Sequence, residues 1–186
     1  MKTAVIRAGV AATAMLSLMT AAPVASAAEA PAPEVNTPIA TVNIDGIEVD
    51  KGAPAETRDI IETDTAAAIA TANVCGSGYT ISTGAWRYST YGTTYTWTNG
   101  KTSGSGYYDK PICAVFFNDT GASRSMGVRL ESNYTADASV QDFGTYSTYA
   151  GPVYQKRGYC GTVYSYMKNS SGTVVVDNIE TIGACD

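Results

Sequence analysis

The sequence predicts an all-β fold, a small antiparallel β-sandwich or barrel with two disulfides, and three observations support this prediction. From Cys75 onward, short apolar stretches alternate with turn residues, and no ten-residue window has helical periodicity. All 13 Tyr, 3 Phe and 2 Trp fall between residues 75 and 186, and so do all 4 Cys. The chain has 186 residues, so this region of about 112 has the length of one domain.

The first 27 residues are typical of a secretory signal peptide. Lys2 and Arg7 form a positive start, an apolar run follows over residues 8–22, and residues 25–27, Ala-Ser-Ala, offer a cleavage site of small residues. The apolar run is too short and too rich in alanine for a membrane-spanning helix. We therefore expect a secreted, extracellular protein with no membrane contact after signal cleavage.

Residues 28–74 differ in character from the region that follows. They contain no aromatic side chain, and residues 1–74 carry 4 Lys and Arg against 9 Asp and Glu. The pattern predicts a small hairpin around Asp45-Gly46 and a short helix over residues 58–73. Because this stretch has few large apolar residues for a core of its own, we expect an acidic pro-segment or a flexible spacer. We favour a pro-segment that is removed near residues 72–74.

Strand patterns fill the rest of the chain. An alternation of apolar and polar residues starts at Met126, and a hairpin signal, with a turn at residues 169–172, precedes the last strand. Spacings of this kind are typical of antiparallel sandwiches and barrels. The predicted strands are residues 79–83, 86–91, 93–98, 112–118, 126–132, 152–155, 159–168 and 173–177.

Four cysteines in an exported domain of this size predict two disulfides. The residues are Cys75, Cys113, Cys160 and Cys185, and no Cys-x-x-Cys pair favours a metal site instead. Three connectivities are possible, and the sequence does not choose among them. We favour Cys75–Cys113 and Cys160–Cys185, because the second bond would hold the C-terminus against the final hairpin.

Charge and composition exclude several functions. Residues 75–186 carry 8 basic and 8 acidic side chains, so the domain offers no basic surface for nucleic acid. The sequence contains no His, which excludes Ser-His-Asp and Cys-His catalysis and His-based zinc sites. Most carboxylates of the domain fall at turns, where Asp bonds to the local backbone. We expect no cofactor, no metal and no enzymatic activity.

Tyrosine is the residue that points to a function. Thirteen tyrosines interleaved with Ser, Thr and Gly are more aromatic side chains than one small core can hold, together with the Phe and Trp residues. Tyrosine gives a large contact area at low entropic cost, which suits a binding surface. The candidate binding residues are Trp86, Arg87, Tyr88, Tyr107, Tyr108, Tyr149 and Tyr154.

Three short motifs together resemble a known family. They are CGSGY at residues 75–79, CAV at residues 113–115, and YAGPV at residues 149–153 just ahead of YCG at residues 159–161. The sequence is similar here to the spore-associated protein A family of actinomycetes, over about residues 75–186. The resemblance implies a secreted, non-enzymatic protein of the spore or cell-wall surface, with no established biochemical activity.

A weaker similarity suggests an alternative function. Trp86-Arg87-Tyr88 resembles the exposed Trp-Arg-Tyr wedge of secreted proteinaceous α-amylase inhibitors, and an arginine between aromatic residues is typical of binding hot spots. The partner would then be an extracellular hydrolase, of the amylase or protease type, entered by this triplet or by the loop at residues 100–106. We favour a simpler explanation of the triplet, a strand with Trp86 and Tyr88 on one face. A hydrolase with paired carboxylates is a third hypothesis.

Overall fold

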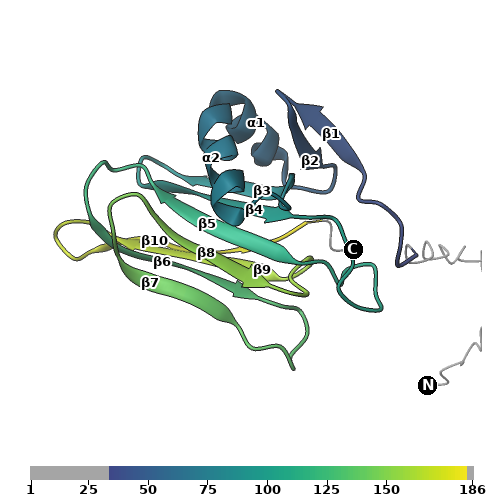
Figure 1. Cartoon of the computed structure of the whole chain (residues 1–186). Helices are drawn as coiled ribbons and strands as arrows, with labels where there is room; N and C mark the ends of the chain where they lie inside the picture. Colours follow the sequence, from purple (N-terminus) through teal and green to yellow (C-terminus); the bar gives the residue numbers. More distant parts are fainter. Residues whose placement is uncertain (1–33, 184–186) are drawn as a thin grey trace, which may run out of the picture. The chain divides into compact units, whose positions relative to one another are not determined.

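The computed structural model describes residues 34–183, which form three layers (Figure 1). A six-stranded sheet, in the order β1-β2-β3-β4-β5-β8, lies between two helices and a four-stranded sheet, in the order β10-β9-β6-β7. The predicted signal peptide, residues 28–33 and Cys185 lie outside the described residues. No helix in the described part is long and apolar enough to span a membrane.

The secondary-structure elements follow one another in a simple order along the chain. A hairpin and two helices come first, and eight strands follow. The bounds are β1 Thr41–Ile44, β2 Ile47–Asp50, α1 Ala55–Thr63, α2 Thr65–Cys75, β3 Ile81–Tyr88, β4 Gly92–Thr98, β5 Ile112–Asn118, β6 Arg124–Glu131, β7 Val140–Tyr146, β8 Tyr149–Gln155, β9 Thr162–Lys168 and β10 Val174–Thr181.

The structure confirms the all-β sandwich and the predicted strands, with two differences. The first two predicted strands are one strand, β3, with a register shift between Ser82 and Gly84. The sequence pattern also missed β7, which pairs with β6 from Arg124↔Tyr146 to Leu130↔Val140. In β7 only alternate residues are half-buried and the rest are exposed, so its apolar signal is weak.

The N-terminal segment, residues 34–74, packs against the domain. Its hairpin forms as predicted, and β2 extends the six-stranded sheet through a short parallel pairing with β3. The predicted single helix is two helices, because Asp64 adopts a non-helical conformation and accepts a hydrogen bond from Ala67 N at 3.2 Å as the N-cap of α2. Gly76, with a φ of 98°, ends α2 in a conformation that favours glycine.

Two apolar cores lie on opposite faces of the six-stranded sheet. The core between the sheets contains Ile112 and Phe116 of β5, Met126 and Leu130 of β6, and Val163 of β9, all fully buried. The core beneath the helices is formed by residues of the N-terminal segment and of β3, β4 and β5. They are Ile47, Val49, Ala53, Ile60, Ile61, Ala68, Cys75, Ala85, Tyr95, Trp97, Cys113 and Val115. The N-terminal segment thus builds no core of its own and instead completes one with β3, β4 and β5.

The disulfide predicted between Cys75 and Cys113 is present, with a Cα–Cα distance of 5.9 Å. It joins the last residue of α2 to strand β5, which lies between β4 and β8, across 38 residues of sequence. A closure of this size typically stabilises a domain by about 2–4 kcal/mol. The second predicted disulfide includes Cys185, which lies outside the described residues.

Candidate aromatic binding surfaces

The triplet Trp86-Arg87-Tyr88 does not form an exposed wedge. Trp86 is 3% exposed and its ring lies over Gly84 in the core between the sheets. Tyr88 follows it on the same face and meets Phe116 edge-on at 5.7 Å. Trp86 is therefore not the surface residue that a binding role requires: β3 lies inside a sheet that is covered on both faces, and its residues 82–86 are all buried.

Arg87 is the exposed member of the triplet. It points to the helix side, where its guanidinium lies 3.8 Å from the Asp64 carboxylate, with both side chains substantially exposed. An ion pair of this kind contributes little to stability. Tyr88 instead donates a hydrogen bond to Ser165 Oγ at 3.3 Å, and burial raises its pKa to about 12. These are contacts of a structural strand.

Tyr107 and Tyr108 surround a buried lysine. Their rings meet edge-on at 5.1 Å, and both pack against the ring of Tyr159. The ammonium of Lys110, which is 1% exposed, lies over the Tyr107 ring at 3.5 Å and donates a hydrogen bond to the Tyr107 carbonyl. Burial lowers the pKa of Lys110, and the charge of Asp50 opposes that shift.

The acidic partner of this cluster comes from the N-terminal segment. Asp50, at the end of β2, is 3% exposed and accepts a hydrogen bond from Tyr159 Oη at 2.5 Å. Its other oxygen accepts a hydrogen bond from Gly52 N at 2.9 Å. Asp50 and Lys110, which are 60 residues apart in the sequence, therefore meet at Tyr159: the Asp50 carboxyl group binds its hydroxyl, and the Lys110 amino group lies over its ring at 5.6 Å. Tyr107 and Tyr108 serve this polar core.

Tyr149 and Tyr154 lie on the helix side of β8. Tyr149 stacks on Phe117 at 5.4 Å, and the Phe117 ring meets Tyr95 edge-on. Tyr154 is 45% exposed, lies against Tyr79 at 5.6 Å and donates a hydrogen bond to the Cys75 carbonyl at 3.2 Å. The seven predicted binding residues thus fall in three separate places and do not form one surface.

A different aromatic surface covers the outer side of the four-stranded sheet. Phe143 of β7 and Tyr164 and Tyr166 of β9 lie with ring centroids 6.2–6.4 Å apart. Their rings are inclined to one another by 30–47°. Phe143 is 42% exposed, and both tyrosines are partly exposed. We call these three side chains the aromatic face.

Gly127 leaves room for the Phe143 ring directly against the sheet. It lies between Phe143 and Tyr166 in the register of the sheet, and a Cβ at this position would be 2.2 Å from Phe143 Cδ1. The phenyl ring therefore occupies the space above the glycine, with one side on the strand and the other toward solvent. A side chain at position 127 would force the ring away from the sheet.

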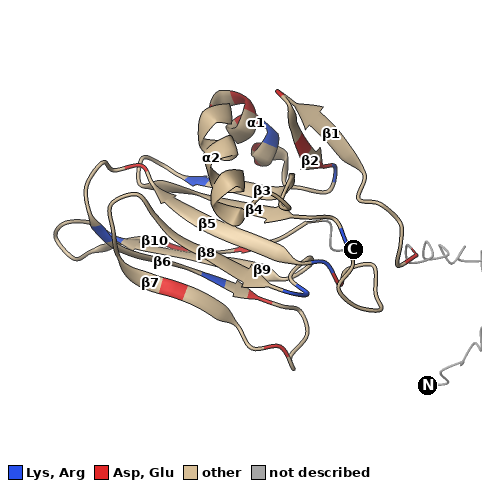
Figure 2. Ribbon diagram, viewed as in Figure 1, with Lys and Arg blue, Asp and Glu red and all other residues tan. Residues whose placement is uncertain are grey.

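Charged groups of both signs surround the aromatic face. The guanidinium of Arg129 lies over the Tyr164 ring at 4.7 Å, and its Nε is 2.7 Å from Glu131 Oε1. Tyr164 Oη donates a hydrogen bond to Asp177 at 2.8 Å. Burial, and then this hydrogen bond, raises the pKa of Tyr164 to about 12. Figure 2 shows no continuous run of one charge along these strands.

Sequence reasoning missed the aromatic face, although part of the signal was present. In β9 the buried Val163, Ser165 and Met167 alternate with Tyr164 and Tyr166, so the two tyrosines had to share the opposite face. The sequence could not place Phe143 beside these two tyrosines, because β7 was not recognised as a strand. The register of β7 with β6, which brings Phe143 to this position, is a property of the folded sheet.

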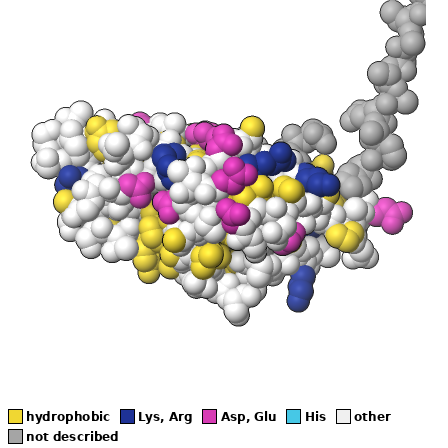
Figure 3. All heavy atoms as spheres, turned by 90° about the horizontal axis from the view of Figure 1, so that it is seen from above, with side chains coloured by type: hydrophobic (Ala, Val, Ile, Leu, Met, Phe, Trp, Pro, Cys, Tyr) yellow, Lys and Arg dark blue, Asp and Glu magenta, His cyan; other side chains and the backbone are white. Residues whose placement is uncertain are grey.

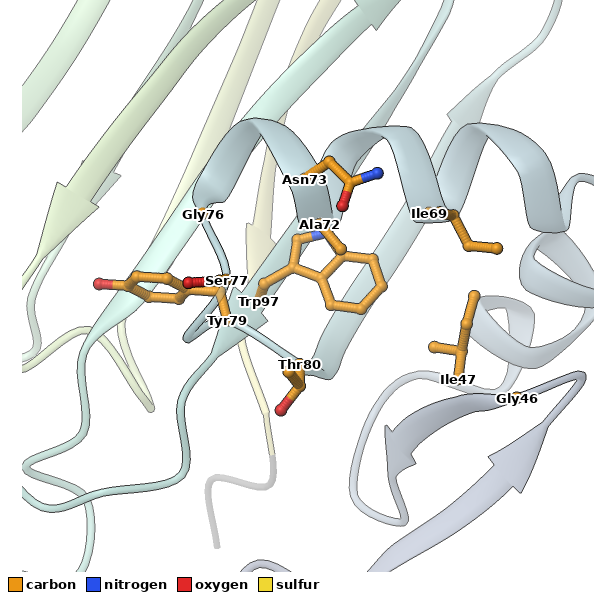
Figure 4. Close-up of a pocket in the computed structure, with 10 residues that line it drawn as sticks. All are labelled: Gly46, Ile47, Ile69, Ala72, Asn73, Gly76, Ser77, Tyr79, Thr80 and Trp97. Atoms are coloured by element: carbon orange, nitrogen blue, oxygen red, sulfur yellow. The ribbon is translucent and has the colours of Figure 1, made fainter.

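A cavity of about 220 Å³ opens between α2 and the β1–β2 hairpin. Ile47 and Ile69 approach it from opposite sides, and the Trp97 indole lies beneath α2 (Figure 4). The Trp97 ring is fixed by a hydrogen bond from Nε1 to Thr71 Oγ1 at 3.0 Å. Neither a carboxylate nor an amine lines this cavity, so it offers a small apolar recess at the seam of the N-terminal segment.

The surface on the helix side is acidic along α1. Glu56, Asp59 and Glu62 are exposed, and the view from above shows acidic side chains beside basic ones, with hydrophobic side chains in small separate groups (Figure 3). Elsewhere, Asp137 lines a polar cavity, but both of its oxygens bind Arg157, which lowers its pKa. That carboxylate is a poor general base.

Residues 34–183 contain no group of three or more His, Cys, Asp or Glu side chains placed to hold a metal ion. No protein-family model matches the chain, and no curated protein or solved structure is significantly similar to it. The resemblance to the spore-associated protein A family therefore stays a prediction. Function has to be argued from the surfaces themselves.

Proposed function

We propose that this chain is an exported, non-enzymatic binding protein of the spore or cell surface, and that the aromatic face is its contact surface. The observation that carries the proposal is the open side of the four-stranded sheet, where Phe143 is 42% exposed beside two partly exposed tyrosines. The six-stranded sheet is covered on both faces over β4, whose residues are all buried. Exposed contiguous aromatic side chains favour an interaction site.

The alternative function, inhibition of a hydrolase, has less support. Inhibition through the triplet requires Trp86 to enter a target cleft, but the side chain is 3% exposed and its ring fills the space above Gly84. Extracting a buried tryptophan of this kind costs about 3–5 kcal/mol. Inhibition through the loop at residues 100–106 stays a prediction. The aromatic face needs no such rearrangement to meet a partner, and we retain it as the proposed site.

Sedimentation with washed spores and cells of the producing strain tests the proposal. We expect the purified full-length protein, expressed for export, to co-sediment with them, and Phe143→Ala to reduce the bound fraction at least about fivefold, because an aromatic contact is worth about 1 kcal/mol or more. Tyr154→Ala is the matched control, since Tyr154 is similarly exposed on the other side of the molecule.

Two results would contradict the proposal. The first is a protein that stays in the supernatant with both spores and cells. The second is a Phe143→Ala variant that sediments as well as the unaltered protein. Loss of sedimentation in Tyr154→Ala alone would place the contact on the helix side and would equally overturn the assignment to the aromatic face.

A further inference from the structure

We infer that the ligand of the aromatic face is an uncharged polysaccharide, bound by stacking of its sugar rings. This inference rests on the proposed function, because it names the chemistry of the partner for the same surface. It depends on three features of the described residues: the flat position of Phe143, the polar groups beside the rings, and the balance of charge on the sheet.

The open side of the Phe143 ring matches the flat side of a sugar ring. One side of the Phe143 ring lies on Gly127 and the other is open, with Tyr166 at 6.3 Å and Tyr164 at 6.2 Å. A pyranose ring presents several C–H groups on one side, and the positive ends of these bonds favour the negative face of an aromatic ring. Three neighbouring rings extend the contact along the strands, as a polymer of repeating sugars would require.

The polar groups beside the rings match the hydroxyl groups of a sugar. Arg129 has more donors than its contact with Glu131 uses, and the Glu131 carboxylate can accept further hydrogen bonds. Asp177 accepts a hydrogen bond from Tyr164 and also has free acceptor positions on an exposed side chain. Each sugar hydroxyl group can donate and accept hydrogen bonds. Adjacent hydroxyl groups can therefore bind a guanidinium group and a carboxylate group at the same time.

Charge balance excludes a strongly charged polymer. By strand alternation Arg129 and Lys168 share this side of the sheet with Glu131 and Asp177, which leaves no excess of either sign. A polyanion such as nucleic acid requires clustered Lys and Arg. Proline-rich peptides dock in aromatic grooves, whereas this face is the surface of a sheet. An uncharged polysaccharide fits both the neutral charge and the open side of the Phe143 ring.

The test separates the ligand from the function. Washed spores and cells are treated with periodate, which cleaves the vicinal diols of sugars, or with a protease, and the sedimentation of the full-length protein is measured on each. We expect periodate to reduce binding at least about tenfold and protease to leave it unchanged. Cellulose, insoluble starch and β-1,4-mannan, whose sugar rings carry the vicinal diols that periodate cleaves, then serve as defined probes, and at least one is expected to bind.

Variants connect that binding to the aromatic face. On the polymer that binds, Phe143→Ala and Tyr166→Ala should each raise the Kd about tenfold, equivalent to 1.4 kcal/mol. Tyr154→Ala should keep the Kd of the unaltered protein, and circular dichroism should show that all three variants are folded. A Kd that is insensitive to Phe143→Ala would overturn the inference.

The experiments distinguish failure of the polysaccharide inference from failure of the proposed function. If protease abolishes retention and periodate does not, the partner is a protein, so the polysaccharide inference is wrong while a surface-binding function survives. If retention is absent from untreated spores and cells, the proposed function fails as well. Binding that disappears in moderate salt would indicate an ionic polymer and would also overturn the inference.

Discussion

At the scale of single residues, the contact between Gly127 and Phe143 decides whether the aromatic face exists. The two residues are partners in the β6–β7 register, and the ring occupies the volume that any Cβ would need. Such a pair is a common device of antiparallel sheets, in which an aromatic side chain covers the exposed backbone of a glycine. Here the device also turns one side of the ring toward solvent.

We therefore expect Gly127→Ala to destabilise the folded protein by about 1–3 kcal/mol, because the new methyl group and the phenyl ring compete for one space. Urea denaturation measures the change, and Gly78→Ala, where a Cβ meets no atom within 4 Å, is the control. In a Phe143→Ala background the same substitution should cost much less. Equal costs in the two backgrounds would show that the ring contact is not the cause.

Three tyrosines with raised pKa values predict the response to alkaline pH. Burial raises the pKa of Tyr88, Tyr95 and Tyr164 to about 12, from an ordinary value of 10.0. Between these values the unfolded chain loses protons that the folded chain keeps, so stability is complete below pH 10 and falls as the pH rises toward 12. Lys110 has a lowered pKa and acts in the opposite direction, but only below 10.5.

Urea midpoints at pH 8, 10 and 11 test this expectation. The midpoint should change little between the first two values and fall clearly at the third. Tyr88→Phe removes one of the three groups, and the fall should then be smaller. A midpoint that is the same at pH 8 and pH 11, or a Tyr88→Phe variant with an unchanged fall, would contradict the assignment.

At the scale of elements, the N-terminal segment is tied to the domain by polar as well as apolar contacts. Thr57 Oγ1 of α1 accepts a hydrogen bond from Ala85 N at 3.0 Å, and Thr71 of α2 accepts one from the Trp97 indole. Asp50 of β2 balances the charge of the buried Lys110. Cleavage of the segment near residue 74 stays a prediction. If the segment then left the domain, these stabilising contacts would be lost.

We expect a chain that starts at Cys75 to be less stable than one that starts at residue 34 by at least about 3 kcal/mol, since it loses the apolar residues that cover β3, β4 and β5 and the Asp50 carboxyl group that binds Tyr159. It also exposes Tyr95, Trp97 and Val115, which are at most 1% exposed in the folded protein. Urea denaturation and binding of the dye ANS measure the two effects. Equal midpoints and no dye binding in the two chains would contradict this expectation.

The elements also show where sequence patterns succeed. The bounds of β5 were predicted to the residue, since Ile112–Asn118 is a continuous apolar strand with turn signals on either side. The hairpin of β1 and β2 followed from Asp45-Gly46, both of which have a positive φ. The packing of the helices could not be predicted, because the segment lacks aromatic residues and its core partners lie in β3, β4 and β5.

At the scale of the whole molecule, the number of layers explains why the predicted binding residues are scattered. A two-layer sandwich would leave the outer faces of both sheets open, and the tyrosines of β8 and Arg87 of β3 would then lie on an open surface. Trp86 and Tyr88 face the core between the sheets, so they are buried with or without the helices. The helices convert one outer face into a second core. Alternation in a strand indicates two faces, but it does not indicate which of them another layer will cover.

The disulfide between Cys75 and Cys113 has a consequence for fragments of this chain. Cys75 is the last residue of α2, and the following residues 76–80 form no helix or strand before β3 begins. A peptide bond broken there leaves both pieces in one covalent molecule, whereas a break ahead of Cys75 leaves the two pieces joined by non-covalent contacts alone. Sensitivity to a reducing agent is therefore the property that distinguishes a nicked chain from a separated one.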